Sequence, residues 1–124
     1  MKERLTQLLN ELGPEENLLK LLTEFYHKLS EDILVGFFFS GKDLKEIATN
    51  QMNFMLKSGG LKKEYSGKLP ASAHFNIAPI LKGHFDRRII LLKELLKENG
   101  LNDEQIKTWV DFETQFRSVI ELAP

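Results

Sequence analysis

Apolar residues recur at intervals of three and four along almost the whole chain, and this spacing constrains the fold most strongly. An α-helix turns once in about 3.6 residues, so such intervals place side chains on one face of a helix. The first helix is expected to end at Gly13, and the second to open at Pro14. Three more are expected over about residues 42–58, between Pro79 and Asn99, and from Asn102 onward. No segment alternates as a half-buried strand does, so the sequence predicts an all-α fold.

Local residue chemistry predicts how several of these helices begin. Proline suits the first position of a helix, and Pro14 fills that place in the second one. Ser40 followed by Asp43 has the spacing of a capping box for the third helix. Gly83 weakens the helix around it and indicates that a short helix joins a long one there.

Length and composition exclude several classes of protein. The 124 residues suit a single domain, 1–124, with 42% hydrophobic and 28% charged residues. A net charge of −1 provides no basic surface for nucleic acid, and no apolar run is long enough to cross a membrane. The chain contains no cysteine, which excludes disulfides, thiolate nucleophiles and ordinary iron–sulfur clusters. Because the first residues also lack a signal-type apolar segment, we expect a cytoplasmic protein.

Three polar residues interrupt the apolar stripes. His84 follows Leu81 and precedes Phe85 at helical spacing inside the longest predicted helix, Tyr26 borders the stripe of the second helix, and Gln51 interrupts that of the third. Polar groups directed at one apolar interior suggest an enclosed cofactor with an open coordination position. A lone histidine is nevertheless more often a surface residue or a satisfied core residue. The nine phenylalanines fit either a plain aromatic core or a wide, flat apolar pocket.

A series of short motifs occurs in a characteristic order between residues 12 and 97. They are Phe25-Tyr26, Phe38-Phe39-Ser40-Gly41, Gln51, Gly59-Gly60, Tyr65-Ser66-Gly67, Ala73-His74 and His84-Phe85-Asp86. In this order and spacing they resemble the truncated haemoglobins, and group I in particular. The resemblance implies a globin-like two-over-two fold, in which two antiparallel helix pairs form a sandwich around haem b.

The resemblance also assigns roles to individual residues of this sequence. His84 matches the proximal histidine that binds the haem iron, while Tyr26 and Gln51 match distal residues that stabilise a bound gas. Ile47 stands where many globins have a distal histidine. Further positions match residues that contact the cofactor: Phe38, Phe39, Leu44, Ile47, Phe54, Met55, Tyr65, His74 and Phe85. A neutral imidazole is a good iron ligand, and a single one leaves the sixth position open for a diatomic gas.

Two features depart from the family pattern. Gly13-Pro14 replaces a glycine pair, and Arg88 stands where an apolar residue is expected. His74 is a weaker candidate than His84 for the iron ligand because its neighbours are small and polar, and His27 is expected to be exposed. The cationic side chains that could pair with the haem propionates are Lys42, Lys45 and Arg87.

The function that follows is reversible binding of dioxygen and of other diatomic gases such as nitric oxide and carbon monoxide. Oxygen transport is one role consistent with this, and oxidation of nitric oxide by bound dioxygen is another. The latter requires an external reductase, because the chain contains no electron donor of its own. A haem-free globin-like regulatory or interaction module is the alternative from a different class of protein.

Overall fold

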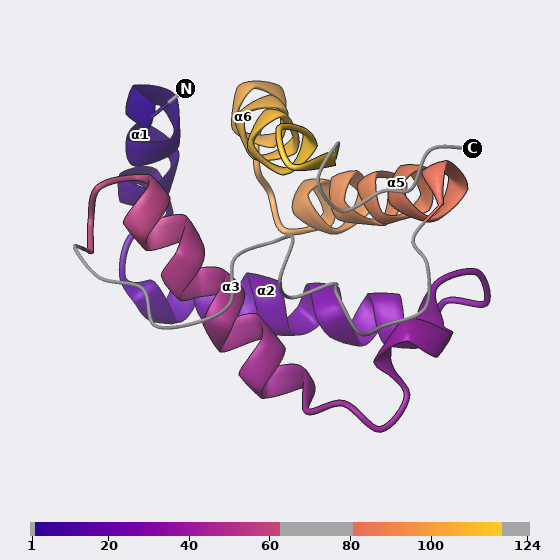
Figure 1. Cartoon of the computed structure of the whole chain (residues 1–124). Coiled ribbons are helices and arrows are strands. Elements are labelled where there is room, and N and C mark those ends of the chain that lie inside the picture. Colours follow the sequence, from indigo (N-terminus) through magenta and orange to yellow (C-terminus); the bar gives the residue numbers. More distant parts are fainter. Residues whose placement is uncertain (1, 63–80, 118–124) are drawn as a thin grey trace.

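The computed structural model describes residues 2–62 and 81–117 of the chain (Figure 1). These residues form five α-helices and one 3-10 helix, with no strand among them. In chain order the elements are α1 (Lys2–Leu12), α2 (Glu15–Ser30), η1 (Gly36–Phe39), α3 (Leu44–Ser58), α5 (Lys82–Glu98) and α6 (Asp103–Thr114). The prediction of an all-α fold is confirmed.

The helix ends agree with the sequence in most places and differ at the starts of α2, α3 and α5, the last of which is described with the candidate site. Asn102 and Gln105 form the expected capping box of α6, with reciprocal hydrogen bonds of 2.8 and 2.9 Å. Pro14 is the N-cap residue of α2 rather than its first helical residue. The predicted Ser40–Asp43 capping box is wrong. Asp43 is itself the N-cap of α3, and its carboxylate accepts a hydrogen bond of 3.2 Å from the Glu46 amide.

Two helix pairs make up the body of the molecule, with α2 at its centre. The most extensive packing is between α2 and α3, which cross each other, while α5 packs on α6 and also contacts α2 (Figure 1). The first helix, α1, packs mainly against α6. This arrangement of two paired layers is the two-over-two globin sandwich that the sequence predicted.

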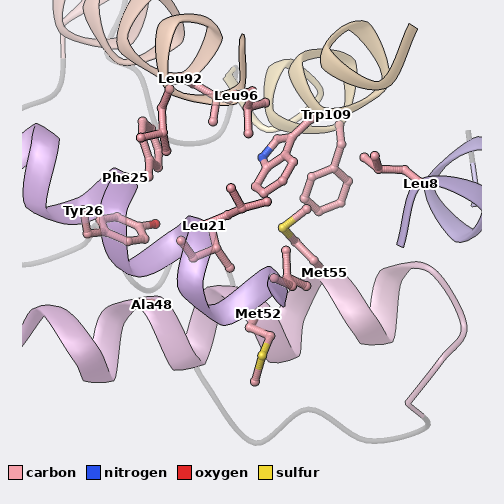
Figure 2. Close-up of a cluster of buried hydrophobic side chains, with 14 of the residues drawn as sticks. Leu8, Leu21, Phe25, Tyr26, Ala48, Met52, Met55, Leu92, Leu96 and Trp109 are labelled. Carbon is pink, nitrogen blue, oxygen red and sulfur yellow. The ribbon is translucent and has the colours of Figure 1, made fainter. Parts of the chain in front are cut away.

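The hydrophobic core fills the space where these helices meet (Figure 2). Its largest fully buried side chains include Trp109, Phe25, Met55, Leu92 and Leu96, which come from α2, α3, α5 and α6. At the crossing of α2 and α3 the small residue Ala48 has no exposed surface, which allows the two helices to approach closely.

A tight turn after α2 leads into three consecutive phenylalanines, two of which contact His84 of α5 while the third contacts Tyr26 of α2. The Gly36 amide donates to the Asp32 carbonyl at 2.8 Å, which folds the chain back onto the end of α2. A Cβ atom at Gly36 would lie 2.6 Å from the backbone oxygen of Ser30, so this position requires glycine. The turn therefore positions η1, which contains Phe37, Phe38 and Phe39.

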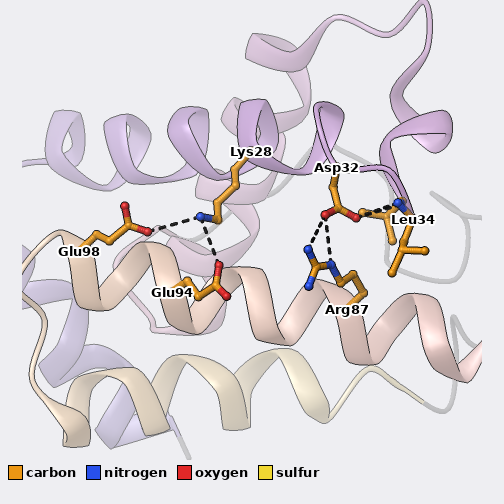
Figure 3. Close-up of polar contacts among 7 residues, drawn as sticks. Lys28, Asp32, Leu34, Arg87, Glu94 and Glu98 are labelled. Carbon is orange, nitrogen blue, oxygen red and sulfur yellow. Dashed lines mark hydrogen bonds and ion pairs between the residues drawn. The ribbon is translucent and has the colours of Figure 1, made fainter.

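Ion pairs join α2 and its following turn to α5 (Figure 3). The Asp32 carboxylate accepts two hydrogen bonds from the Arg87 guanidinium, of 3.1 and 2.7 Å, and further bonds from the Leu34 and Val35 amides. The bonds from Arg87 lower the pKa of Asp32. Lys28 lies 3.4 Å from both Glu94 and Glu98. None of the helices described here has the length and apolar character needed to span a bilayer.

Candidate functional site

His84 lies in the first turn of α5, beside the phenylalanines of η1. Its side chain is half-buried, and its imidazole meets the Phe38 ring edge-on at 5.1 Å and the Phe37 ring at 5.7 Å. The sequence placed His84 further inside a long apolar helix, with Leu81 at helical spacing. That expectation is wrong for Leu81, which is the N-cap residue of α5, has an extended backbone and is 48% exposed. The described helix begins at Lys82 and runs without interruption through Gly83.

The His84 imidazole has one hydrogen bond to the backbone. Its Nδ1 accepts from the Leu81 amide at 3.0 Å and so caps the first turn of α5. Within the described ranges, Nε2 has no hydrogen-bond partner, and no group of three or more metal-binding side chains surrounds it. A histidine that binds a metal through Nε2 usually carries its proton on Nδ1. Because a protonated Nδ1 cannot accept a hydrogen bond, metal binding at Nε2 would break the bond from the Leu81 amide.

Tyr26 lies in the third quarter of α2, with 5% of its surface exposed. Its ring contacts Phe39 edge-on at 5.8 Å and Phe25 at 5.5 Å. The hydroxyl accepts a hydrogen bond of 3.3 Å from Nη2 of Arg88. Across residues 2–62 and 81–117 the same hydroxyl donates no hydrogen bond of its own.

Arg88 is held in place by a buried carboxylate of α6. Its Nε and Nη2 donate to the two oxygens of Glu113 at 2.8 and 3.1 Å, and the two side chains are 19% and 5% exposed. Burial raises the pKa of the Tyr26 phenol, the Arg88 charge opposes this, and Glu113 adds to it. Although burial disfavours the charged guanidinium, the attraction of Glu113 keeps the pKa of Arg88 above its ordinary value. The site thus contains a neutral phenol beside a compensated ion pair.

One face of α3 carries a stripe of half-buried side chains. Leu44, Ile47, Gln51 and Phe54 follow each other at intervals of three and four, next to the buried stripe of Ala48, Met52 and Met55. The Gln51 amide has no hydrogen-bond partner among the residues that the structure describes. Phe54 also contacts Phe116 at 5.2 Å. The stripe is an incompletely covered apolar surface with a single amide in its middle.

The two neighbouring phenylalanines of η1 connect the candidate residues. Phe38 contacts His84, and Phe39 contacts Tyr26, so the histidine and the tyrosine approach the same short segment from different helices. Phe85 is 2% exposed, with the Arg117 guanidinium 4.9 Å from its ring centre. Gln51 and Ile47 lie on α3, and no hydrogen bond or ring contact joins them to Tyr26 or His84 in the described part of the chain.

The other candidates are placed as follows. His27 is exposed, as expected, and Lys42 and Lys45 are exposed as well. Arg87, a candidate partner for a propionate, is instead paired with Asp32 at 2.7 Å. Tyr65 and His74 lie outside the described residues.

Comparison with known proteins places this geometry in a family. Residues 7–121 match the family described as bacterial-like globin, which is nearly the whole chain. The chain belongs to that family. The relatives described below are truncated haemoglobins.

Individual relatives agree with this assignment. A group 1 truncated haemoglobin of Chlamydomonas moewusii is 31% identical over 100 residues, which are 80% of this chain. The chain spans 58% of the length of that relative. The truncated haemoglobin of Tetrahymena pyriformis, solved in its Fe(III) form, is 27% identical with a TM-score of 0.82, covering 94% of this chain and 98% of the other. The 2/2 haemoglobin of a Synechococcus species, solved in the cyanomet state with covalently attached haem, shares the fold with a TM-score of 0.71 at 23% identity, covering 91% of this chain and 89% of that one.

The residues of this globin fit a haem group. The His84 imidazole would hold the iron, and no group of three or more metal-binding side chains occurs in the described ranges, which suits an iron that keeps one position open. The half-buried apolar residues Phe38, Phe39, Leu44, Ile47 and Phe54 pack on the core yet keep part of their surface uncovered. An apolar surface of this kind suits a flat, apolar ring.

Sequence reasoning missed Glu113, although a signal for it was present. Glu113 follows Trp109 by four residues and Val110 by three, so it lies on the inward face of α6. A carboxylate there requires a buried cation, because an unpaired buried charge is strongly unfavourable. Arg88 stands where the family pattern has an apolar residue, and its ion pair with Glu113 explains both departures.

Proposed function

We propose that this globin binds haem b through His84 and reversibly holds dioxygen and other diatomic gases on the side of Tyr26 and Gln51. The observation that carries the proposal is the contact of His84 and Tyr26 with the adjacent rings of Phe38 and Phe39. The proposal is supported by this arrangement, because an imidazole that would bind the metal and a phenol that would donate to the gas contact one aromatic segment.

Haem would supply an iron centre that coordinates a diatomic gas. The protein would contribute the His84 imidazole to hold the iron and the rings of Phe38 and Phe39 as apolar contacts. These groups come from α5 and η1, and the Asp32–Arg87 ion pair of 2.7 Å joins α5 to the turn that precedes η1. The ion pair therefore supports the site without belonging to it.

Tyr26 and Gln51 would determine which gases the pocket retains. Both side chains can donate a hydrogen bond, and neither gives its hydrogen to another residue of the described chain. A polar ligand that gains negative charge on binding is stabilised by such donors, whereas a nearly neutral one is not. Ile47, one turn before Gln51, would add apolar bulk without competing for the metal.

Haem titration of the purified protein tests this function. We expect saturation at one haem per chain, a Soret band, and a shift of that band on reduction and on exposure to carbon monoxide. An absence of saturable binding would instead favour the haem-free interaction module. Reversibility is tested by removing carbon monoxide from a saturated sample and following the return of the Soret band to its gas-free position.

Several finer expectations belong to the same proposal and remain predictions. They are the cytoplasmic location, a part in oxygen transport, and an external reductase for any oxidation of nitric oxide. Extraction of the pigment into acidified organic solvent distinguishes haem b, which is released, from a covalently attached haem, which stays with the protein.

A further inference from the structure

The Arg88 guanidinium bonds to two groups at once: the buried Glu113 carboxylate and the Tyr26 hydroxyl. Nε and Nη2 both bond to the Glu113 carboxylate, and Nη2 also reaches the Tyr26 hydroxyl at 3.3 Å. The guanidinium carbon lies 4.9 Å from the centre of the Phe25 ring and 5.5 Å from that of Tyr26. Arg88 is therefore fixed by a carboxylate on one side and by two aromatic rings on the other.

A buried ion pair is seldom the most stabilising way to fill a protein core. Two apolar residues of similar volume often give equal or greater stability, because the charges need not be removed from water. Here the pair does one thing that apolar residues cannot do. It brings a hydrogen-bond donor to the oxygen of a buried tyrosine that packs on η1.

We propose that Arg88, anchored by Glu113, is a positioning residue that holds the Tyr26 hydroxyl with its own hydrogen directed at the bound gas. The inference rests on the proposed function, in which Tyr26 donates to that gas. A hydroxyl that accepts from Arg88 cannot turn the same lone pair elsewhere, so its hydrogen is restricted to the remaining directions. The described residues offer no acceptor in those directions.

The charges of the pair also affect the strength of the donor. A cation beside the phenol oxygen stabilises partial negative charge there and makes the O–H a stronger donor. Glu113 compensates the charge of Arg88, so the phenol keeps its proton. Arg88 on α5 and Glu113 on α6 are the charged groups that act on Tyr26 in the described structure.

Titration of Tyr26 in the full chain tests the contact itself. The chain contains two tyrosines, so the ultraviolet tyrosinate signal lost in Tyr26→Phe isolates the titration of Tyr26. Arg88→Met should raise the pKa of Tyr26, because it removes the neighbouring cation. Glu113→Gln should lower it, because the cation is then uncompensated. A purely structural role would not move the two variants in opposite directions, and shifts of the same sign would overturn the proposal.

Gas release from the haem-loaded protein tests the consequence for ligands. Arg88→Met should speed dioxygen release about two- to tenfold, the factor that one net hydrogen bond provides, and leave carbon monoxide release unchanged. Arg4→Met is the matched control, since Arg4 pairs with Asp111 of α6 at 3.2 Å and does not touch Tyr26. Equal changes for both gases, or no change for either, would overturn the inference.

A second variant covers the case in which a single substitution prevents folding. Arg88→Met combined with Glu113→Leu removes both charges and leaves no buried ion without a partner. This double variant should still raise the pKa of Tyr26 and speed dioxygen release selectively, and a wild-type release rate in it would refute the positioning role. A wild-type protein that binds no haem would overturn the proposed function. If the wild type binds haem and the Arg88 variants release dioxygen at the wild-type rate, only this inference would be overturned.

Discussion

Tyr26→Phe is the substitution that most cleanly separates hydrogen bonding from steric effects in this globin. Tyr26 is 5% exposed, and its ring contacts Phe25 and Phe39 at centroid distances of 5.5 and 5.8 Å. Phenylalanine retains the ring and these contacts, so only the hydroxyl is lost. In the proposed function the variant therefore removes a donor without opening the pocket.

The size of the effect follows from the burial of the hydroxyl. A hydrogen bond to a charged group contributes about 1.5–3 kcal/mol, and a site shielded from water lies toward the upper end. This corresponds to dioxygen release that is about ten- to a hundredfold faster. The cost to folding should be only about 1 kcal/mol, because Nη2 of Arg88 keeps its bond of 3.1 Å to Glu113.

Stopped-flow release of dioxygen and of carbon monoxide provides the assay. Carbon monoxide gains little negative charge on binding, so its release should stay close to the wild-type rate. Urea unfolding of the same samples controls for a general loss of stability. If Tyr26→Phe accelerated the release of both gases equally, a steric gate would account for the data and the hydrogen-bond reasoning would be refuted.

Three further outcomes are expected. Gln51→Leu should also speed dioxygen release, and its effect should be non-additive with that of Tyr26→Phe if both donors serve one ligand, as a double-mutant cycle of release rates would measure. Asp32→Asn should destabilise the protein at neutral pH, because the hydrogen bonds from Arg87 lower the folded-state pKa of Asp32. The stabilisation by the Asp32 carboxylate is complete above its unfolded pKa of about 4 and is lost as the pH falls through its folded pKa. Urea unfolding should therefore show the stabilities of wild type and variant converging in acid. Ala48→Leu should overpack the crossing of α2 and α3 and cost about 1–3 kcal/mol of unfolding free energy, and a thermal midpoint equal to the wild type would contradict the packing described for this residue.

Helix existence and topology were predictable because local signals and the apolar period agree. The cap of α6 shows this, since Asn102 and Gln105 satisfy each other within one turn and need no tertiary contact. The start of α3 was harder, because the Ser40–Asp43 spacing predicts a cap at Ser40, whereas η1 and the residues after it bring Asp43 to the N-cap position. Helix ends that depend on a neighbouring element cannot be read from sequence spacing alone.

The candidate site was predictable in its residue types and less so in its contacts. The apolar residues around His84 indicate its role, but the hydrogen bond from the Leu81 amide to its imidazole depends on where α5 begins. Arg88 was recognised as anomalous, whereas its partner Glu113 is separated from it by the turn between α5 and α6. The pairing of side chains from two different helices depends on the tertiary fold. The sequence indicates only that Glu113 lies on the inward face of α6.

Haem binding by His84→Gly tests the central claim most directly. The account predicts that this variant loses the Soret band of the wild type or binds haem only weakly, and that added imidazole restores it by filling the space of the missing side chain. His27→Gly is the control, since His27 is exposed on α2 and should bind haem as the wild type does. An unchanged ferrous spectrum in His84→Gly without added imidazole would contradict the assignment of His84 as the iron ligand.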